Sequence, residues 1–298
     1  MSLSLSDVRL QPRHRPVSST GWTNASLLPT AIPIGEPSLC GQARRLLEST
    51  GLCLDEISVR YFRGIHAFVP VVSRRQFQAR LLSFGADPQV DVALLLLCMA
   101  LLTSADSPET GGRRVGDQTP YLAIKSLVAQ TQALCAPTTR LVQVGVLLAV
   151  YEYASGHPET AFITIGSSAR MAYAARLRPS PSLNGPVPLT DWIAEEEINI
   201  WGFIRADKRR TFLCELPAVE QPLGSVMPAR DDRLPLESDI LDHENAVAAL
   251  AWSVAIHAVS VPEVGGFGRA AQAAWLLDGA LQGLSLTDPD RKRTHLAD

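Results

Sequence analysis

The chain has 298 residues, which is enough for one large domain or two small ones with an ample apolar core. Hydrophobic residues make up 46% of the chain and charged residues 19%, a composition that suits helices packed closely on helices. The formal net charge of -3 argues against a general electrostatic grip on nucleic acid, which needs clustered Lys and Arg.

The first segment, residues 1–36, is rich in Ser, Pro and Thr and shows no apolar period, so we expect a disordered arm. Its start lacks the basic residues and the continuous apolar stretch of a secretory signal. The longest apolar run is the 11 residues of Val92–Leu102, whereas a bilayer span needs about 20. We therefore expect a soluble intracellular protein that makes no contact with a membrane.

Residues 37–298 predict one all-α, multi-helix antiparallel domain. Apolar periods and capping residues predict helices over 38–50, 55–64, 74–84, 89–103, 120–135, 138–155, 158–177, 190–213, 240–260 and 264–284. Segments rich in Gly, Pro and polar residues predict loops over 104–119, 178–189 and 215–238. No alternating pattern indicates a strand.

The helix predicted over 138–155 is apolar on nearly every face, which is typical of a central helix. Gly156 ends it, and Pro158 occupies the first turn of the next helix, where a missing N–H is tolerated. Two helices joined by so short a break are expected to pack antiparallel.

The cysteines are odd in number and far apart, and no two have the C-x2-C spacing that lets one turn present two thiolates to zinc. They are Cys40, Cys53, Cys98, Cys135 and Cys214. Each lies in or beside an apolar helical stretch, so we interpret them as structural thiols. We expect no metal site and no cofactor.

Few residues suggest catalysis, and we assign no catalytic residue and no enzymatic activity. His66 lies in an apolar stretch and is interpreted as a core histidine bonded to backbone, in preference to a proton-transfer group. His157 is explained by the helix start that follows it. Glu195–Glu197 are three consecutive positions that point around a helix, which favours a solvated first turn.

One alternative depends on Asp231 and Asp232, which with Glu237 resemble the magnesium-binding motifs of prenyl-processing helical enzymes. The second carboxylate cluster that this mechanism would need is missing from the sequence. Gly265–Gly268 precede a predicted helix, but no strand comes before them, so the context argues against a phosphate cradle.

Two basic runs could mark nuclear import or a nucleic-acid patch. Lys208–Arg210 and Arg291–Arg293 contain three residues each, whereas runs of about 5–8 are the usual signal. We interpret the first as helix-end charge and the second as a solvated tail. Trp201 lies between apolar neighbours in a predicted helix and is expected in the core.

Three segments in a fixed order carry a family resemblance. They are Tyr61–Val72 followed by Phe77, then Leu141–Ala172 with its Arg-Met-Ala step, and Glu196–Lys208 with its acidic start, Trp and Asp. Together they resemble the signatures of the fungal-specific transcription factor domain, the middle homology region of fungal zinc-cluster regulators. The similarity covers roughly residues 39–236.

The sequence departs from the family pattern at several positions. Ala67 stands where a proline is usual, Ile198–Asn199 stand where arginines are usual, and Leu216–Pro217 only loosely match a Gly-Arg-Pro turn. Residues 1–60 contain two cysteines, whereas the family's zinc-cluster DNA-binding module has six. We therefore expect no zinc-dependent, sequence-specific DNA binding by this chain alone.

What the resemblance implies is a nuclear regulatory protein of transcription. It would act through a protein partner, either a DNA-binding regulator or a second copy of the chain, or by sensing a small-molecule effector. The resemblance also permits control of a fungal secondary-metabolite gene cluster. Two alternatives stay open: a helical enzyme acting on an apolar substrate, and an inactive truncated regulator.

Overall fold

The computed structural model describes residues 36–85, 89–104, 119–177, 197, 199–204, 228–242 and 254–285. In chain order the elements are α1 (Glu36–Ser49), α2 (Leu54–Arg63), the 3-10 turn η1 (Ile65–Ala67), α3 (Arg74–Phe84), α4 (Val90–Thr103), α5 (Thr119–Leu134), α6 (Thr139–Ala154), α7 (Pro158–Ala174), α9 (Ser238–Leu241) and α11 (Gly266–Ser285). The described residues contain no strand, only one isolated bridge, between Arg233 and Ala255. The predicted all-α class is confirmed.

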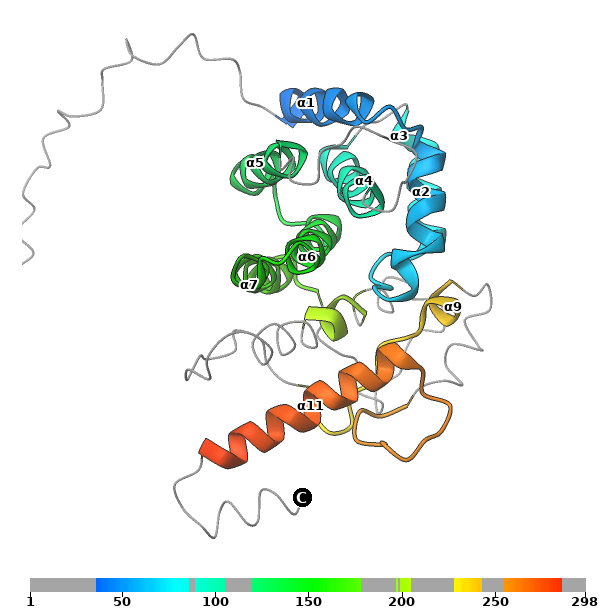
Figure 1. Cartoon of the computed structure of the whole chain (residues 1–298), viewed down its shortest axis with the longest axis vertical. Coiled ribbons are helices and arrows are strands. Elements are labelled where there is room, and N and C mark those ends of the chain that lie inside the picture. Colours follow the sequence, from blue (N-terminus) through cyan, green and yellow to red (C-terminus); the bar gives the residue numbers. More distant parts are fainter. Residues whose placement is uncertain are drawn as a thin grey trace, which may run out of the picture. The chain divides into compact units, whose positions relative to one another are not determined.

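The centre of the fold is α4, in which every residue is buried. Its apolar run leaves no polar face to turn toward solvent, so helices must cover it on all sides. Figure 1 shows α4 surrounded by α1, α2, α5 and α6, and all four of these helices contact it. The sequence singled out 138–155 as the central helix, but α4 shares that position with α6.

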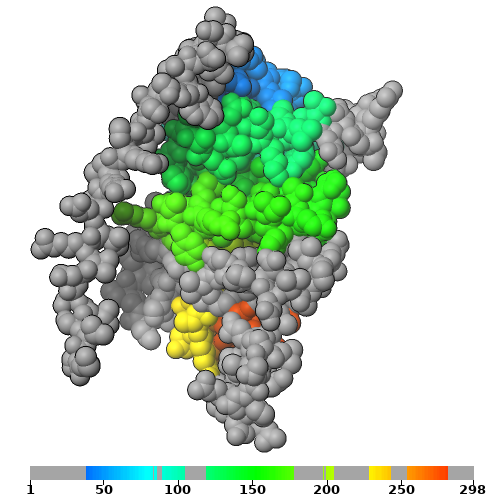
Figure 2. Space-filling view, turned by 90° about the vertical axis from the view of Figure 1, so that its left-hand side faces the viewer, coloured from blue at the N-terminus to red at the C-terminus, as the bar shows by residue number. Residues whose placement is uncertain are grey.

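The most extensive helix pair is α6 with α7. Thr138 caps α6 by accepting a hydrogen bond from the Leu141 N–H at 3.2 Å, and Gly156 turns the chain with a φ of 80°. Close packing depends on Gly145 of α6, where a Cβ would collide with the Ser168 side chain of α7. Figure 2 shows residues 119–177, in green, as one continuous surface next to α1, in blue.

Most predicted helix boundaries lie within about two residues of the observed ones, as expected for helix ends. The first helix begins earlier than the predicted residue 38, because α1 starts at Glu36. Of the helix predicted over 190–213, the described residues 197 and 199–204 are helical. The others lie outside the described residues.

The helix predicted over 240–260 is wrong at residues 254–260, which are not helical. Residues 240 and 241 are helical but belong to the short α9, which ends at Leu241, and residues 243–253 lie outside the described residues. The Leu234 N–H donates to the Val254 carbonyl and the Ile256 N–H to the Asp232 carbonyl, each at 2.8 Å. Because these backbone groups are used between segments, they cannot close helical turns.

Within the part of the chain that the structure describes, no helix is long and apolar enough to cross a membrane.

Candidate functional site

The loop of residues 69–72, which follows η1, is held by side chains from distant parts of the chain. The Gln143 side chain of α6 donates to the Val71 carbonyl at 2.8 Å, and both residues are buried. The Tyr61 hydroxyl of α2 donates to the Val69 carbonyl at 3.3 Å. The first and second signature segments are therefore joined by hydrogen bonds at this loop.

Asn199 brings the third signature segment to the same loop. Its side-chain amide donates to the carbonyls of Pro70 and Leu236, each at 2.8 Å. Its side-chain carbonyl accepts from the Leu236 N–H at 2.7 Å. Asn199 is fully buried, so these bonds replace all of its contact with water. The sequence signal for this role is a lone Asn between apolar residues, and the family pattern by itself marks this position only as a departure.

His66 is a core histidine, 2% exposed, as predicted. It packs edge-on against Phe62, with ring centres 4.9 Å apart. The predicted partner was wrong, because the His66 Nε2 atom lies 3.1 Å from a carboxylate oxygen of Asp242 and not on a backbone group. The other Asp242 oxygen accepts from the Arg74 N–H at 2.8 Å. Asp242 thus links α9 to the first signature.

A charged cluster around the buried Glu152 carboxylate joins α5, α6 and α7. Glu152 is 1% exposed, and one of its oxygens accepts from the Tyr121 hydroxyl at 2.7 Å and from the Lys125 ammonium at 2.5 Å. Lys125 also donates to the Thr164 hydroxyl at 3.3 Å. The second Glu152 oxygen is buried without a hydrogen-bond partner.

These contacts perturb the titration of the neighbouring groups. Burial raises the pKa of Tyr121, and the Glu152 carboxylate adds to this effect against an opposing hydrogen bond from Lys125. Burial by itself would lower the pKa of Lys125, but the hydrogen bonds and charge of its two partners raise it. Burial, followed by the Glu152 charge, raises the pKa of the Cys98 thiol, so Cys98 stays protonated and inert.

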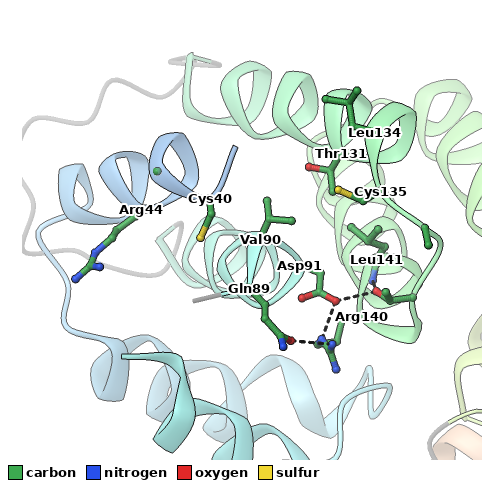
Figure 3. A pocket seen from close by; sticks show the side chains of 13 residues that line it. Cys40, Arg44, Gln89, Val90, Asp91, Thr131, Leu134, Cys135, Arg140 and Leu141 are labelled. Carbon is green, nitrogen blue, oxygen red and sulfur yellow. Dashed lines mark hydrogen bonds and ion pairs between the residues drawn. The ribbon is translucent and has the colours of Figure 1, made fainter. Parts of the chain in front are cut away.

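A cavity of about 870 Å³ opens between α1, the start of α4, the end of α5 and the start of α6. Figure 3 shows Cys40 and Cys135 on opposite walls, with Gln89, Asp91 and Arg140 gathered at one end. An Asp91 oxygen accepts from the Arg140 Nε atom and from the Thr138 hydroxyl, each at 2.9 Å. No sequence pattern predicts this cavity, because its walls come from four separate helices.

Asp231 and Asp232, on which the magnesium-binding alternative depends, make contacts within the fold itself. Asp232 accepts from the Ala229 N–H at 2.8 Å and closes a turn. The Asp231 side chain is 69% exposed and lies 3.6 Å from the His257 ring. Among the described residues, no group of three or more His, Cys, Asp or Glu side chains could hold a metal ion. The expected absence of a metal site and cofactor stays a prediction.

The glycines at 265–268 lie against a carboxylate of the chain itself, that of Glu237. A Glu237 oxygen accepts from the Gly268 N–H in the first turn of α11, at 2.9 Å. A Cβ on Gly265 would collide with the Glu237 side chain. A carboxylate of the chain already occupies this helix start, so the helix N-terminus is not open to a phosphate.

His157 is the residue before α7, and Pro158 occupies the first turn, as predicted. Trp201 is 1% exposed and donates from its indole N–H to the Leu177 carbonyl at 3.3 Å, so its predicted core position is confirmed. Cys40 and Cys98 are buried, but Cys53 is exposed just before α2 and is not a core thiol.

Several singled-out residues lie outside the described residues, and their interpretations stay predictions. They are Glu195, Glu196, Cys214 and the basic runs Lys208–Arg210 and Arg291–Arg293.

Comparison with known proteins places these contacts in a family context. Residues 59–215 match the model of the fungal specific transcription factor domain. The chain is similar to transcription factor BOA15 of Botryotinia fuckeliana (strain B05.10), with 33% identity over 146 residues that cover 48% of this chain and 78% of the relative. No solved structure matches the chain. The matched range contains all three signature segments, including the side chains that meet at loop 69–72.

Proposed function

The chain belongs to the fungal specific transcription factor domain family, and on that premise we propose that it is a nuclear regulator of transcription. The observation that carries the proposal is the convergence of all three signature segments on loop 69–72. Gln143 and Asn199, from the second and third segments, both bond to the backbone of this loop. The three signature segments therefore contact one another within one folded unit, which supports a single regulatory domain.

The enzyme alternative has no comparable support. It depends on Asp231 and Asp232, and Asp232 serves a turn while Asp231 is largely exposed. The family is one of transcription factors, which fits a role without catalysis.

The regulator's contact with DNA would come from a partner protein that is itself a DNA-binding regulator. A second copy of the chain would form a dimer without supplying this contact. The net charge of -3 supports this, because sequence-independent binding to phosphates requires clustered positive charge. A small-molecule effector would adjust the regulator's activity. Genes of a fungal secondary-metabolite cluster are the targets that we propose.

The proposal is tested by comparing promoter occupancy in the cell with DNA binding by the purified chain. An epitope-tagged copy should occupy discrete promoters, and deletion of the gene should change the transcripts of those targets. The purified chain at near-physiological salt should give no discrete footprint on the same promoters.

The control for the footprint is the same DNA with a nuclear extract that contains the tagged chain. Absence of promoter occupancy and of any transcript change would contradict a regulatory function. Protection of a discrete site by the purified chain would contradict the dependence on a partner.

A further inference from the structure

The cavity between α1, α4, α5 and α6 has the size of a ligand site. Its volume of about 870 Å³ lies within the range of about 300–1,000 Å³ that small-molecule sites occupy. Much of its wall is apolar, formed by Val90, Leu134, Ala136 and Leu141. Such a wall accommodates an apolar body, and specificity then depends on the few polar groups around it.

The charged residues that line the cavity are Arg44, Asp91 and Arg140, which sum to one positive charge. The Asp91 charge is matched inside the protein by Arg140, with 2.9 Å between the guanidinium nitrogen and the carboxylate oxygen. Its other oxygen is buried and does not reach the open space. The acidic group is therefore not offered to a ligand.

The positive charge of Arg44 is poorly matched. Its contact with Glu48 is an i,i+4 pair at 3.4 Å, with side chains 61% and 67% exposed. Exposed pairs of this kind contribute little, so Arg44 can turn toward an anion at the cavity rim. At the polar end, Arg140 donates to the side-chain Oε1 atom of Gln89 at 3.1 Å, which holds both side chains in place (Figure 3).

We propose that this cavity binds a small molecule with an apolar body and one carboxylate group. That this small molecule is the effector of the regulator rests on the proposed function. That the cavity binds it does not rest on that function.

The test is an anisotropy titration of the complete purified chain with 1-pyrenebutyric acid and with its methyl ester. Both probes have the same aromatic body, and only the acid carries the charge. The acid should bind saturably with one site per chain. The ester should bind at least about threefold more weakly, because it cannot use the net positive charge of the lining.

Gly41 allows the cavity to be filled without disturbing the fold. A Cβ built at Gly41 meets no atom within 4 Å, and Gly41 lines the cavity from α1. Gly41→Leu should weaken binding of the acid by at least about tenfold. The melting temperature should not fall, because Leu is a better helix former than Gly. Gly279→Leu in α11, also with open space around its Cβ, is the matched control and should bind normally.

The role of the Arg44 charge is tested by Arg44→Gln, which should weaken binding of the acid about threefold without changing binding of the ester. Arg45→Gln, an exposed neighbour that does not line the cavity, should bind both probes as the unmodified chain does.

Unchanged binding of the acid to a folded Gly41→Leu variant would overturn the inference. Equal affinity for acid and ester would overturn its carboxylate component. Probe binding by a chain that occupies no promoter would refute the proposed function and leave the cavity assignment intact.

Discussion

At the scale of single residues, Asn199 shows how a departure from a family pattern can be structural. Its amide bonds to Pro70 and Leu236 lie in the interior, where no water can replace them. An arginine in its place would have to bury a charge or leave the site. The departure therefore fits a local arrangement in which Pro235 and Leu236 pack directly on the third signature.

Asn199→Ala should lower the free energy of unfolding by about 3 kcal/mol, because several buried backbone groups lose their partner together. Urea denaturation followed by circular dichroism measures the change. Gln130→Ala removes an exposed contact with Ser126 and should stay within about 0.5 kcal/mol of the unmodified chain. Similar midpoints for the two variants would show that the Asn199 bonds carry no net stability.

Tyr121 and Lys125 make stability depend on alkaline pH. Both pKa values are raised in the folded chain, so each group binds its proton more tightly there than in the unfolded chain. Their contribution is complete below the ordinary values, about 10 for both. It is lost as the pH rises through the folded values.

We therefore expect the free energy of unfolding to fall as the pH rises above about 10, measured by urea denaturation at a series of pH values. Tyr121→Phe removes one of the two titrating groups, so the free energy of unfolding of this variant should fall less steeply with pH. At neutral pH the variant is expected to be less stable than the unmodified chain. Parallel curves for the two proteins would refute the contribution of Tyr121.

At the scale of the helices, the α6–α7 pair depends on small residues at its contact. Gly145 meets Ser168 so closely that any Cβ would force a shift, whereas Gly166 on the outside of α7 has only the Arg170 side chain at 4.0 Å. The same substitution should therefore have opposite effects at the two glycines.

Gly145→Ala should destabilise the chain by about 1–2 kcal/mol, since overpacking outweighs the gain in helix propensity. Gly166→Ala should be neutral or stabilising by up to about 1 kcal/mol. Thermal unfolding of both variants measures these changes in stability. A stabilised Gly145→Ala variant would mean that Ser168 moves aside at little cost.

At the scale of the whole molecule, the family match ends at residue 215, but the packed unit does not. Leu236 completes the hydrogen bonds of Asn199, and Asp242 completes those of His66. Phe267 of α11 belongs to the main hydrophobic core. The described segments beyond the match therefore pack against the matched residues.

A chain that ends at residue 227 should unfold at lower temperature and less cooperatively than the complete chain. It would remove the Leu236 partner of the Asn199 side-chain carbonyl and the Asp242 partner of the His66 ring, at a cost of about 1–3 kcal/mol for each group. Calorimetry of the two proteins under identical conditions provides the comparison. Identical transitions would show that residues 228–285 are an independent appendage.

The helices could be read from the sequence because their causes are local. Apolar period, capping by Ser73 or Thr138 and the positions of Gly and Pro act within a few residues. The same local rules failed at residues 254–260, where backbone groups pair with residues 232–234 instead of closing helical turns. The bonds of Asn199 with Leu236 and of His66 with Asp242, and the cavity at Asp91, join residues that are far apart in the chain. Their geometry depends on how the helices pack, so it became visible only once the packed helices had placed these side chains together.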